Sequence, residues 1–321
     1  MKSFQIIRTH TSPYQKADFL AREKAMLETF PELSPVGLSE ARKTPTILIT
    51  NTHTSLSQLP PWLLDETRLI VHPNSGYDNF TTDHQLWKNT PVVIGHRIRA
   101  QAVAEYSLSA LFQGAAELPR HLSWQKDRSW ERSLLKDSPV WIFGYGHIGK
   151  IVAAALHGLG MKVVIVDPFA RDCPYPCLKQ WSDGDLSAAR AIIACCSLNS
   201  SSRHLFNHDF FASLGEEVIF INGARGKLVE EESLRSYLLA HPRAFAFLDV
   251  FEEEPFNQDW HAFPQVWKTS HIAGVDQDLD QKIIAFSHDV LKDFLNLDSS
   301  AFARLHHKEL LQNKWIEGEL I

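Results

Sequence analysis

Short apolar runs alternate with amphipathic stretches along nearly the whole chain, a pattern typical of parallel α/β proteins. From residue 140 onward, six of these apolar runs have the length of buried strands. We therefore expect one parallel sheet from the middle of the chain, with strands at Val140–Phe143, Val163–Val166, Ala191–Cys196, Val218–Asn222, Ala244–Leu248 and Val266–Thr269.

The first third of the chain predicts a second set of strands, at Phe4–Ile7, Thr46–Thr50, Arg68–His72 and Val92–Ile94. Two long amphipathic helices are expected at Ala102–Leu118 and Gln281–Leu297. Because the six-strand set lies in the middle, the other domain is expected to combine both ends of the chain. The predicted boundaries are residues 1–98 with 287–321 for this discontinuous domain and residues 99–286 for the continuous one. The chain would then pass between the two domains twice, and these two connections would form a hinge over a cleft.

The first strand of the middle set leads into WIFGYGHIGK, where Gly144, Gly146 and Gly149 have the spacing G-x-G-x-x-G. The first glycine permits a tight turn, the second lets the backbone approach a pyrophosphate, and the third lets the next helix lie close to the strand. That helix offers free N–H groups to phosphate at its start. Asp167 closes the next strand, where it would bind ribose hydroxyls and repel a 2′-phosphate. Together these features predict a doubly wound domain that binds NAD.

Composition narrows the setting and the partners. In 321 residues, 32 Lys and Arg face 38 Asp and Glu, a formal net charge of −6, and no basic block indicates a nucleic-acid or anionic-membrane partner. The N-terminus lacks the apolar run of a signal peptide and no stretch reaches membrane-spanning length, so we expect a cytoplasmic protein. Cys173 and Cys177 have a spacing compatible with a metal but lack two further ligands nearby. Reduced thiols and no metal are the favoured interpretation.

Three polar side chains follow strands whose carboxyl ends should share one edge of the sheet. Arg225 lies in INGARG, Glu254 in LDVFEEEP and His271 in TSHIAG. A guanidinium can hold the carboxylate and keto oxygen of a 2-oxo acid by a forked pair of charge-assisted hydrogen bonds. A histidine can give that oxygen its proton as hydride arrives, and a carboxylate beside it fixes the tautomer and raises the pKa of the imidazole. These residues therefore predict hydride transfer between a nicotinamide and a 2-oxo acid.

From about Ile70 onward, the motifs follow the order found in the D-isomer-specific 2-hydroxyacid dehydrogenases, and the chain resembles that family. NSGYDN (Asn74–Asn79) resembles the family's substrate loop, and AVAEY (Ala102–Tyr106) resembles the start of its long interdomain helix. The resemblance implies an NAD-dependent enzyme that interconverts a small 2-oxo acid and its D-2-hydroxy acid. It also implies an NAD-binding Rossmann domain, a discontinuous flavodoxin-like α/β domain, and a homodimer with the long helix near the two-fold axis.

The resemblance assigns roles residue by residue. Arg225 is implied to bind substrate, Glu254 to partner the histidine, and His271 to act as acid and base; only the following proline distinguishes Glu254 from its acidic neighbours. Ser75 and Gly76 match the loop whose N–H groups receive the substrate carboxylate, although the same residues could form only a turn. The positions implied to contact the cofactor are Gly144, Gly146, His147, Ile148, Gly149, Asp167, Cys196, Gly223, Arg225, Asp249, His271 and Gly274, with Asp249 at the nicotinamide amide.

The sequence also departs from the family's pattern. Ser270 stands where a proline usually precedes the catalytic histidine, and Cys196 lies where a histidine or threonine followed by proline is common. Arg97 and Arg99 occupy positions that often hold small or amide residues. A solvated loop is the favoured interpretation of this pair, and a second anion contact, for a phosphate or extra carboxylate on the substrate, is the alternative. Arg171, soon after Asp167, could soften discrimination against NADP.

Two other functions are compatible with the same fold. An NAD(H)-sensing dimeric scaffold of the corepressor type keeps these residues without significant turnover, but an added tail or peptide-binding extension distinguishes it, and this chain ends soon after its final predicted helix. A formate-dehydrogenase-like reaction fits less well, because that branch of the family has glutamine at the position of Glu254. We therefore favour the NAD-dependent dehydrogenase.

Overall fold

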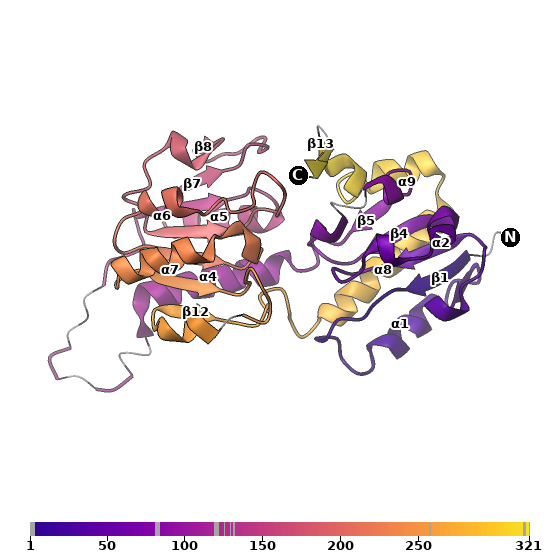
Figure 1. Cartoon of the computed structure of the whole chain (residues 1–321), viewed down its shortest axis with the longest axis horizontal. Coiled ribbons are helices and arrows are strands. Elements are labelled where there is room, and N and C mark those ends of the chain that lie inside the picture. The colour runs from indigo at the N-terminus through magenta and orange to yellow at the C-terminus, as the bar shows by residue number, and fades with distance from the viewer. Residues whose placement is uncertain are drawn as a thin grey trace. The chain divides into compact units, whose positions relative to one another are not determined.

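A computed structural model of the chain describes residues 4–80, 84–118, 122–124, 126–128, 130, 132–256, 258–316 and 319–320. It consists of two compact units (Figure 1). Unit 1 comprises Met1–Arg99 and Val275–Ile321, and unit 2 comprises Ala100–Gly274. The chain therefore passes from unit 1 to unit 2 after Arg99 and returns after Gly274.

In its described residues, unit 2 holds a seven-stranded parallel sheet in the order β12-β11-β10-β9-β6-β7-β8. Read from β8 and numbered from β6, the first strand of the unit, the order is 3-2-1-4-5-6-7, and its first six strands have the order of a doubly wound dinucleotide domain. The strands are β6 (Pro139–Phe143), β7 (Lys162–Val166), β8 (Cys177–Leu178), β9 (Ala191–Ala194), β10 (Ile219–Asn222), β11 (Phe245–Leu248) and β12 (Val266–Lys268). The helices are α4 (Ala100–Ala116), α5 (His147–Gly158), α6 (His208–Ala212) and α7 (Glu231–Ala240), with the 3₁₀ helices η5 (Trp181–Asp183), η6 (Gly226–Leu228) and η7 (Gln258–Ala262).

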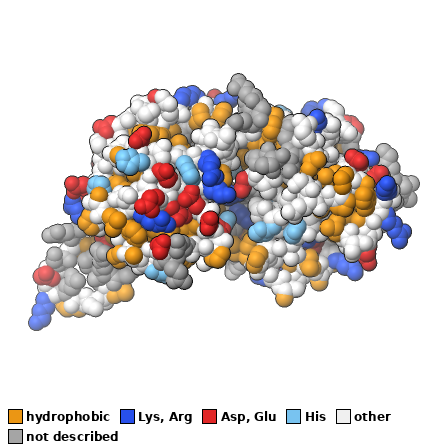
Figure 2. Space-filling view, in the orientation of Figure 1, with side chains coloured by type: hydrophobic (Ala, Val, Ile, Leu, Met, Phe, Trp, Pro, Cys, Tyr) orange, Lys and Arg blue, Asp and Glu red, His pale blue; other side chains and the backbone are white. Residues whose placement is uncertain are grey.

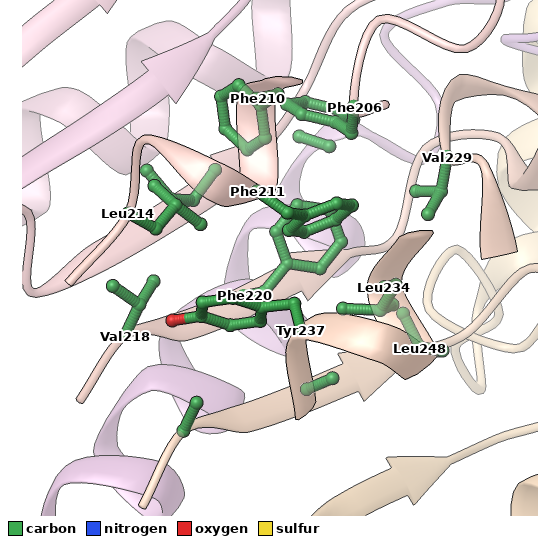
Figure 3. Close-up of a cluster of buried hydrophobic side chains, with 14 of the residues drawn as sticks. Phe206, Phe210, Phe211, Leu214, Val218, Phe220, Val229, Leu234, Tyr237 and Leu248 are labelled. Atoms are coloured by element: carbon green, nitrogen blue, oxygen red, sulfur yellow. The ribbon is translucent and has the colours of Figure 1, made fainter. Parts of the chain in front are cut away.

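Helices cover both faces of this sheet, and alternate residues of the central strand β6 supply both cores. Val140 and Ile142 pack with residues of α4 and α5, whereas Trp141 and Phe143 pack with residues of α6 and α7. Figure 3 shows the second of these clusters, in which the rings of Phe206, Phe210, Phe211 and Phe220 meet edge to face. Burial on both faces explains why the strands read as continuous apolar runs rather than as an alternation.

Unit 1 holds a five-stranded parallel sheet among its described residues, in the order β2-β1-β3-β4-β5, which is the flavodoxin-like order. The strands are β1 (Phe4–Arg8), β2 (Leu33–Pro35), β3 (Thr46–Ile49), β4 (Thr67–His72) and β5 (Val92–Ile94), with a hairpin of β13 (Trp315–Ile316) and β14 (Glu319–Leu320). The helices are α1 (Phe19–Leu27), α2 (Pro61–Glu66), α3 (His84–Trp87), α8 (Leu279–Asn296) and α9 (Ser299–Leu305), with the 3₁₀ helices η1 (Leu38–Glu40), η2 (Leu56–Gln58), η3 (Asp78–Phe80) and η8 (Leu311–Lys314).

Helix α8 shows how the end of the chain joins unit 1. Its residues Leu279 and Ile283 pack against Phe19 of α1, and Val290 and Leu291 continue into the core on one face of the sheet. Residues 275–286, predicted to belong to the continuous domain, are therefore grouped with unit 1. An amphipathic pattern indicates that a helix has a buried face, but it does not indicate which sheet that face covers.

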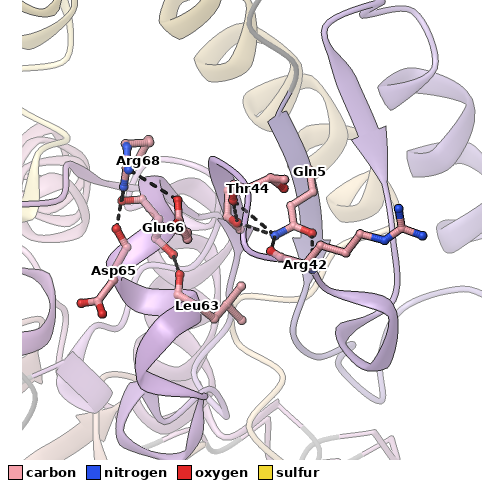
Figure 4. A network of polar contacts seen from close by, with 9 residues as sticks. Gln5, Arg42, Thr44, Leu63, Asp65, Glu66 and Arg68 are labelled. Atoms are coloured by element: carbon pink, nitrogen blue, oxygen red, sulfur yellow. Dashed lines mark hydrogen bonds and ion pairs between the residues drawn. The ribbon is translucent and has the colours of Figure 1, made fainter.

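A polar network ties the amino end of the unit 1 sheet together (Figure 4). Gln5 at the start of β1 donates from Nε2 to the carbonyl of Arg42 (2.6 Å) and to Oγ1 of Thr46 (2.7 Å), and its Oε1 accepts from the Arg42 N–H (3.0 Å). These bonds satisfy a buried amide and fix the entry to β3. The opposite, carboxyl end of a parallel sheet, where ligands usually bind, is left to the loops described next.

Candidate active site

The turn between β6 and α5 is shaped by its glycines. Gly144 has φ +98, and a Cβ there would lie 2.7 Å from the backbone nitrogen of Cys196. A Cβ on Gly149 would lie 2.0 Å from the carbonyl oxygen of Gly144, so only glycine lets α5 start this close to the strand. Gly146, the N-cap of α5, would place a Cβ in open space, with no heavy atom within 4 Å. The turn therefore leaves room over the helix N-terminus, as a bound pyrophosphate requires.

Asp167 lies directly after β7, beside this turn. Its Oδ2 accepts the Tyr145 N–H at 2.7 Å and its Oδ1 accepts the Phe169 N–H at 2.8 Å. Each carboxylate oxygen can accept a further hydrogen bond, so the ribose hydroxyls of a dinucleotide remain possible partners. Arg171 is exposed in the following loop, and no ion pair joins it to another described residue. The donors and the space around the turn thus suit NAD.

Arg225 is positioned by the end of β10. Asn222, the last residue of that strand, is fully buried and donates from Nδ2 to the Arg225 carbonyl at 2.9 Å, while its Oδ1 accepts the Ala224 N–H at 3.1 Å. The Arg225 guanidinium, half-buried, donates to the Ala224 carbonyl at 2.8 Å. Gly226 then packs directly against the next loop, since a Cβ there would lie 1.7 Å from the Phe251 carbonyl oxygen. The sequence analysis did not predict that Asn222 and Gly226 support Arg225. The available signals were a polar residue at the end of an apolar strand and a glycine directly after the arginine.

His271 and Glu254 form a hydrogen-bonded pair. Nδ1 of His271 lies 2.9 Å from Oε2 of Glu254, and both side chains are partly open to solvent. Partial burial by itself raises the pKa of Glu254, but the hydrogen bond and charge of His271, the Phe251 N–H and the nearby Arg225 charge together lower this pKa below its usual value. Glu254 is therefore a carboxylate at neutral pH. Because Nδ1 is engaged, Nε2 is the nitrogen of His271 left to exchange a proton with another molecule.

Asp249 holds the loop that carries His271. The carboxylate is almost fully buried and accepts three hydrogen bonds, from Thr269 Oγ1 (2.6 Å), the Ile272 N–H (2.8 Å) and the Ala273 N–H (2.7 Å). Its carbonyl accepts the His271 N–H at 2.8 Å. His271 has φ +56, a left-handed conformation that is unfavourable for a residue with a side chain and that the surrounding bonds must maintain. Sequence reasoning assigned Asp249 to the nicotinamide amide and missed this supporting role.

Tyr106 of α4 extends the same network. Its hydroxyl lies 2.9 Å from Oγ1 of Thr269, and burial raises the pKa of Tyr106 to about 12, despite the hydrogen bond with Thr269, which lowers it. The phenol therefore stays protonated and can donate. The family-like AVAEY segment thus does more than begin the long helix, because its tyrosine supports the loop of the histidine motif.

The remaining predicted cofactor positions surround the same edge of the sheet. Cys196 lies after the end of β9, which stops at Ala194 rather than at Cys196 as predicted, and burial raises the pKa of its thiol to about 12, so it is not a nucleophile at neutral pH. Gly223 follows β10, with Val103, Tyr106 and Ala273 each 3.6 Å from where its Cβ would be. His147 and Ile148 open helix α5, and Gly274 is the last residue of unit 2.

In unit 1, the loop with Ser75 and Gly76 follows β4 at the carboxyl end of the sheet. The His72 ring, fully buried, bonds Gly76 O through Nε2 (2.8 Å) and Thr50 Oγ1 through Nδ1 (2.9 Å), so Nε2 carries the proton. Asn79 donates from Nδ2 to the carbonyls of Asn51 and Thr54. Within the described part of the chain, the N–H groups of Ser75 and Gly76 donate to no acceptor. A fixed loop with two available N–H groups fits a carboxylate.

Arg97 and Arg99 each have protein partners in unit 1. Arg97 pairs with Glu309 (Nε to Oε1, 3.5 Å). Arg99 is only 8% exposed and donates to the Pro73 carbonyl (2.8 Å) and to the Tyr14 hydroxyl (2.7 Å), with its guanidinium over the Tyr14 ring. Arg99 therefore does not lie in a solvated loop, which corrects the favoured interpretation. Its contact with Pro73 supports the base of the Ser75–Gly76 loop.

The described residues contain no group of three or more His, Cys, Asp or Glu side chains arranged to hold a metal ion, and all four cysteines are free thiols. Among the helices described, none is both long and apolar enough to cross a membrane. Figure 2 shows acidic side chains next to basic ones over the visible face.

A doubly wound sheet, an open glycine turn followed by a strand-end aspartate, and an arginine beside a His–Glu pair define the class of dinucleotide-dependent oxidoreductases. The chain belongs to the D-isomer-specific 2-hydroxyacid dehydrogenase family, because residues 107–273 match the family's NAD-binding domain. The family, the α/β fold and NAD as the family's cofactor, all predicted from the sequence, are confirmed.

Individual proteins support the same assignment. The chain is 30% identical over 233 residues to (S)-sulfolactate dehydrogenase of Chromohalobacter salexigens, covering 68% of this chain and 74% of that one. It is 28% identical over 193 residues to hydroxypyruvate reductase of Thermotoga maritima, covering 59% of this chain and 63% of that enzyme, somewhat less than two thirds. The fold is shared with D-lactate dehydrogenase from Aquifex aeolicus, solved with NAD and lactic acid (TM-score 0.75, 19% identity, 96% and 99% of the chains covered). These comparisons give no support to a corepressor-type scaffold.

Proposed function

We propose that this chain is an NAD-dependent D-2-hydroxyacid dehydrogenase that acts on a small 2-oxo acid or its D-2-hydroxy acid. The observation that carries the proposal is the His271–Glu254 hydrogen bond close to Arg225. The loops that hold these side chains follow β10, β11 and β12, which are neighbours in the unit 2 sheet. We further propose that unit 2 binds the cofactor and that Ser75 and Gly76 of unit 1 bind the substrate carboxylate.

In this proposal Arg225 binds and orients the substrate. Its planar guanidinium can donate two parallel hydrogen bonds, one to the carboxylate and one to the keto oxygen of a 2-oxo acid. Positive charge beside the keto oxygen also stabilises the negative charge that develops there during reduction. Ser75 and Gly76 would receive the other carboxylate oxygen through their available N–H groups.

His271 is proposed to move the proton. In reduction the imidazolium gives its Nε2 proton to the keto oxygen, which becomes the hydroxyl, and the imidazole is left neutral; in oxidation Nε2 takes that proton back. Glu254 keeps Nδ1 as a donor at 2.9 Å and stabilises the charged ring. When bound, the nicotinamide supplies or accepts the hydride, so proton and hydride together convert the ketone to the alcohol.

The cofactor is proposed to lie along the carboxyl edge of the unit 2 sheet. Gly144, Gly146, Gly149 and the first N–H groups of α5, at His147 and Ile148, would hold the pyrophosphate. Asp167 would hold the adenosine ribose. The nicotinamide end would then lie near Cys196, Gly223, Asp249 and Gly274, with Arg225 and His271 beside its ring.

Oxidation of NADH with a panel of 2-oxo acids tests this function. Glyoxylate, pyruvate, hydroxypyruvate and oxaloacetate would be compared, with NADPH in parallel. We expect turnover with at least one acid, a higher kcat/KM with NADH than with NADPH, and loss of turnover in His271→Asn with NADH binding retained. Tight NADH binding without turnover on any acid would contradict the proposal and favour a sensing scaffold.

We also propose a homodimer formed through the C-terminal half of α4 and the described residues that follow it. Phe112 and Leu118 are 44% and 53% exposed, and together with Trp130 they line a hollow of about 350 Å³. Leu122 and Trp124 beyond it are more than four-fifths exposed. A patch of large apolar side chains on one segment is typical of an interaction surface. The resemblance to dimeric relatives selects a second copy of this chain as the occupant.

Sedimentation of the wild type and of Phe112→Asp tests the dimer. We expect a wild-type dimer and a variant shifted toward monomer. Leu239→Asp is the matched control, because Leu239 on α7 is 73% exposed but lies outside this patch. A wild-type monomer would overturn the assignment.

We also propose a cytoplasmic location. The free thiols support a reducing setting, and localisation of a tagged chain would check it.

A further inference from the structure

A second histidine–carboxylate pair lies next to the proposed site. Nε2 of His204 donates to Oε1 of Glu252 at 2.5 Å, and the two side chains are 34% and 31% exposed. His204 lies in the loop between β9 and α6, and Glu252 lies in the glutamate motif, two residues before Glu254. The predicted roles for the motifs give this pair no function.

The backbone of His204 joins it to the arginine motif. Its N–H donates to the Lys227 carbonyl at 2.9 Å, and the Phe206 N–H donates to the Leu228 carbonyl at 3.0 Å. A parallel bridge between Phe206 and Val229 continues this pairing. The segment 204–206 therefore runs beside η6, whose N-cap is Arg225.

The glutamate motif meets the arginine motif from the other side. A Cβ on Gly226 would lie 1.7 Å from the carbonyl oxygen of Phe251 and 2.6 Å from the nitrogen of Glu252, so the two backbones are in direct contact. The Glu252 N–H donates at 2.8 Å to Oε1 of Glu231, at the start of α7. The backbone N–H of Glu252 is thus bound to Glu231, and its carboxylate accepts the hydrogen bond from His204.

We propose that His204 is a positioning residue that fastens the glutamate motif to the arginine motif and so sets the distance between Arg225 and Glu254. The inference rests on the proposed function, since it assigns His204 a role in orienting the groups that bind and protonate a 2-oxo acid. His204 is fixed to Lys227 by its backbone and to Glu252 by its side chain. Lys227 lies two residues after Arg225, the proposed substrate-binding residue. Glu252 lies two residues before Glu254, the proposed partner of His271.

The backbone conformation of His204 supports a specific role for its side chain in the contact with Glu252. His204 has φ +51, a left-handed conformation in which glycine is favoured. Both partners are partly solvated, so their pairing adds little to the core. A residue that only had to complete the turn would be better replaced by glycine. The histidine instead supplies a donor that reaches Glu252.

Two substitutions separate positioning from stability. His204→Gly removes the donor but suits the backbone, so its unfolding midpoint in denaturant should equal or exceed that of the wild type. Its kcat/KM for a 2-oxo acid should nevertheless fall by about tenfold to a hundredfold, because a small misplacement of the binding groups slows the reaction that strongly. His204→Gln keeps an N–H donor at the same reach and should recover most of the activity. Glu253→Gln, an exposed neighbour, is the matched control and should remain as active as the wild type.

Two binding measurements complete the test. The Kd for NADH should be unchanged in His204→Gly, because the glycine turn is untouched, whereas the Kd for oxamate in the presence of NADH should rise by a similar factor to the loss in kcat/KM. Oxamate is an unreactive 2-oxo acid analogue, so it reports on Arg225 even if no panel acid is turned over. Lack of turnover in the wild type would thus overturn the proposed function without deciding the role of His204. Unchanged oxamate binding in His204→Gly, or equal losses in the Gly and Gln variants, would overturn that role.

Discussion

The imidazole of His271 and the carboxylate of Glu254 meet at 2.9 Å, although they come from loops after different strands. At this distance the carboxylate oxygen of Glu254 can accept a hydrogen bond from Nδ1 and stabilise a positive charge on the ring. The lowered pKa of Glu254 reflects the same contact, together with the Phe251 N–H and the Arg225 charge, which outweigh the effect of partial burial. The pair therefore offers the most direct test of the proposed chemistry.

Glu254→Gln should move the pH profile of reduction to lower pH. The imidazolium loses a neighbouring anion, so it gives up its proton more readily and the protonated form needed for reduction disappears at a lower pH. The measurement is kcat/KM for reduction across pH, with Glu253→Gln as the control for loss of one negative charge nearby. An unchanged profile in Glu254→Gln would contradict the pairing.

Arg225→Lys should lose most of the activity while keeping the charge. An ammonium cannot reproduce the fork of two hydrogen bonds, and a hydrogen bond to a charged group contributes about 1.5–3 kcal/mol, or roughly tenfold to a hundredfold in kcat/KM. Arg243→Lys serves as the control, because Arg243 forms an exposed ion pair with Glu216 elsewhere in unit 2. Near-normal kcat/KM in Arg225→Lys would remove Arg225 from the substrate site.

Two glycine substitutions should have opposite signatures. Gly146→Ala places a methyl group in open space, so stability should be retained while NADH affinity falls by about tenfold through loss of a close phosphate contact. Gly226→Ala drives a methyl group into the Phe251 carbonyl and should destabilise the fold by about 1–3 kcal/mol. Denaturant unfolding and fluorescence titration with NADH measure the two effects. A stable Gly226→Ala variant would show that the contact between the two motifs can relax.

Asp167→Asn should shift the cofactor preference toward NADPH. The amide keeps an oxygen for one of the two backbone N–H groups at 2.7 and 2.8 Å but no longer repels a 2′-phosphate. The ratio of kcat/KM with NADPH to that with NADH should rise by about tenfold, a change that corresponds to roughly 1.4 kcal/mol. Arg171→Ala should lower the use of NADPH if its guanidinium assists that phosphate. An unchanged ratio in Asp167→Asn would mean that another group selects the cofactor.

Lys314→Met should stabilise the protein at neutral pH. Burial lowers the pKa of Lys314, whose amine lies over the Tyr77 ring, so the unfolded chain holds this proton more tightly than the folded one. That unfavourable contribution is fully present below the folded pKa and disappears as pH rises through the unfolded value, about 10.4. The difference in free energy of unfolding between variant and wild type should therefore shrink toward alkaline pH. A variant that is less stable at neutral pH would mean that contacts of the lysine stem outweigh the buried charge.

The sequence was sufficient to predict most of the strands and the glycine turn before α5. Strands buried on both faces leave continuous apolar runs, and the glycine spacing before α5 has a steric cause that the contact between Gly149 and Gly144 makes explicit. The two-residue strand β8 (Cys177–Leu178) carries no comparable signal, because it is ordered only by pairing with β7. Short pairings of this kind depend on the partner strand and not on a local pattern.

Contacts between distant segments account for what the sequence did not reveal. Arg99 is buried by Tyr14, 85 positions away, and by the Pro73 carbonyl, so its charge alone gave the wrong environment. The support that Asp249 gives to the His271 loop likewise follows from the pairing of β11 with β12, which brings Thr269 and Ala273 to its carboxylate. Motif spacing indicates which residues have a role, but it does not show which of their donor and acceptor atoms already bind other protein groups.

The three hydrogen bonds received by Asp249 bear on how a very small substrate can be bound well. A 2-oxo acid, the proposed substrate, has few atoms and therefore little interaction energy to offset the ordering of loops around it. The buried carboxylate orders residues 269–273, with His271 in its left-handed conformation, through protein groups alone. This loop therefore loses its conformational entropy when the chain folds and not when the proposed substrate binds. Ordering of the loop does not lower the affinity for that substrate.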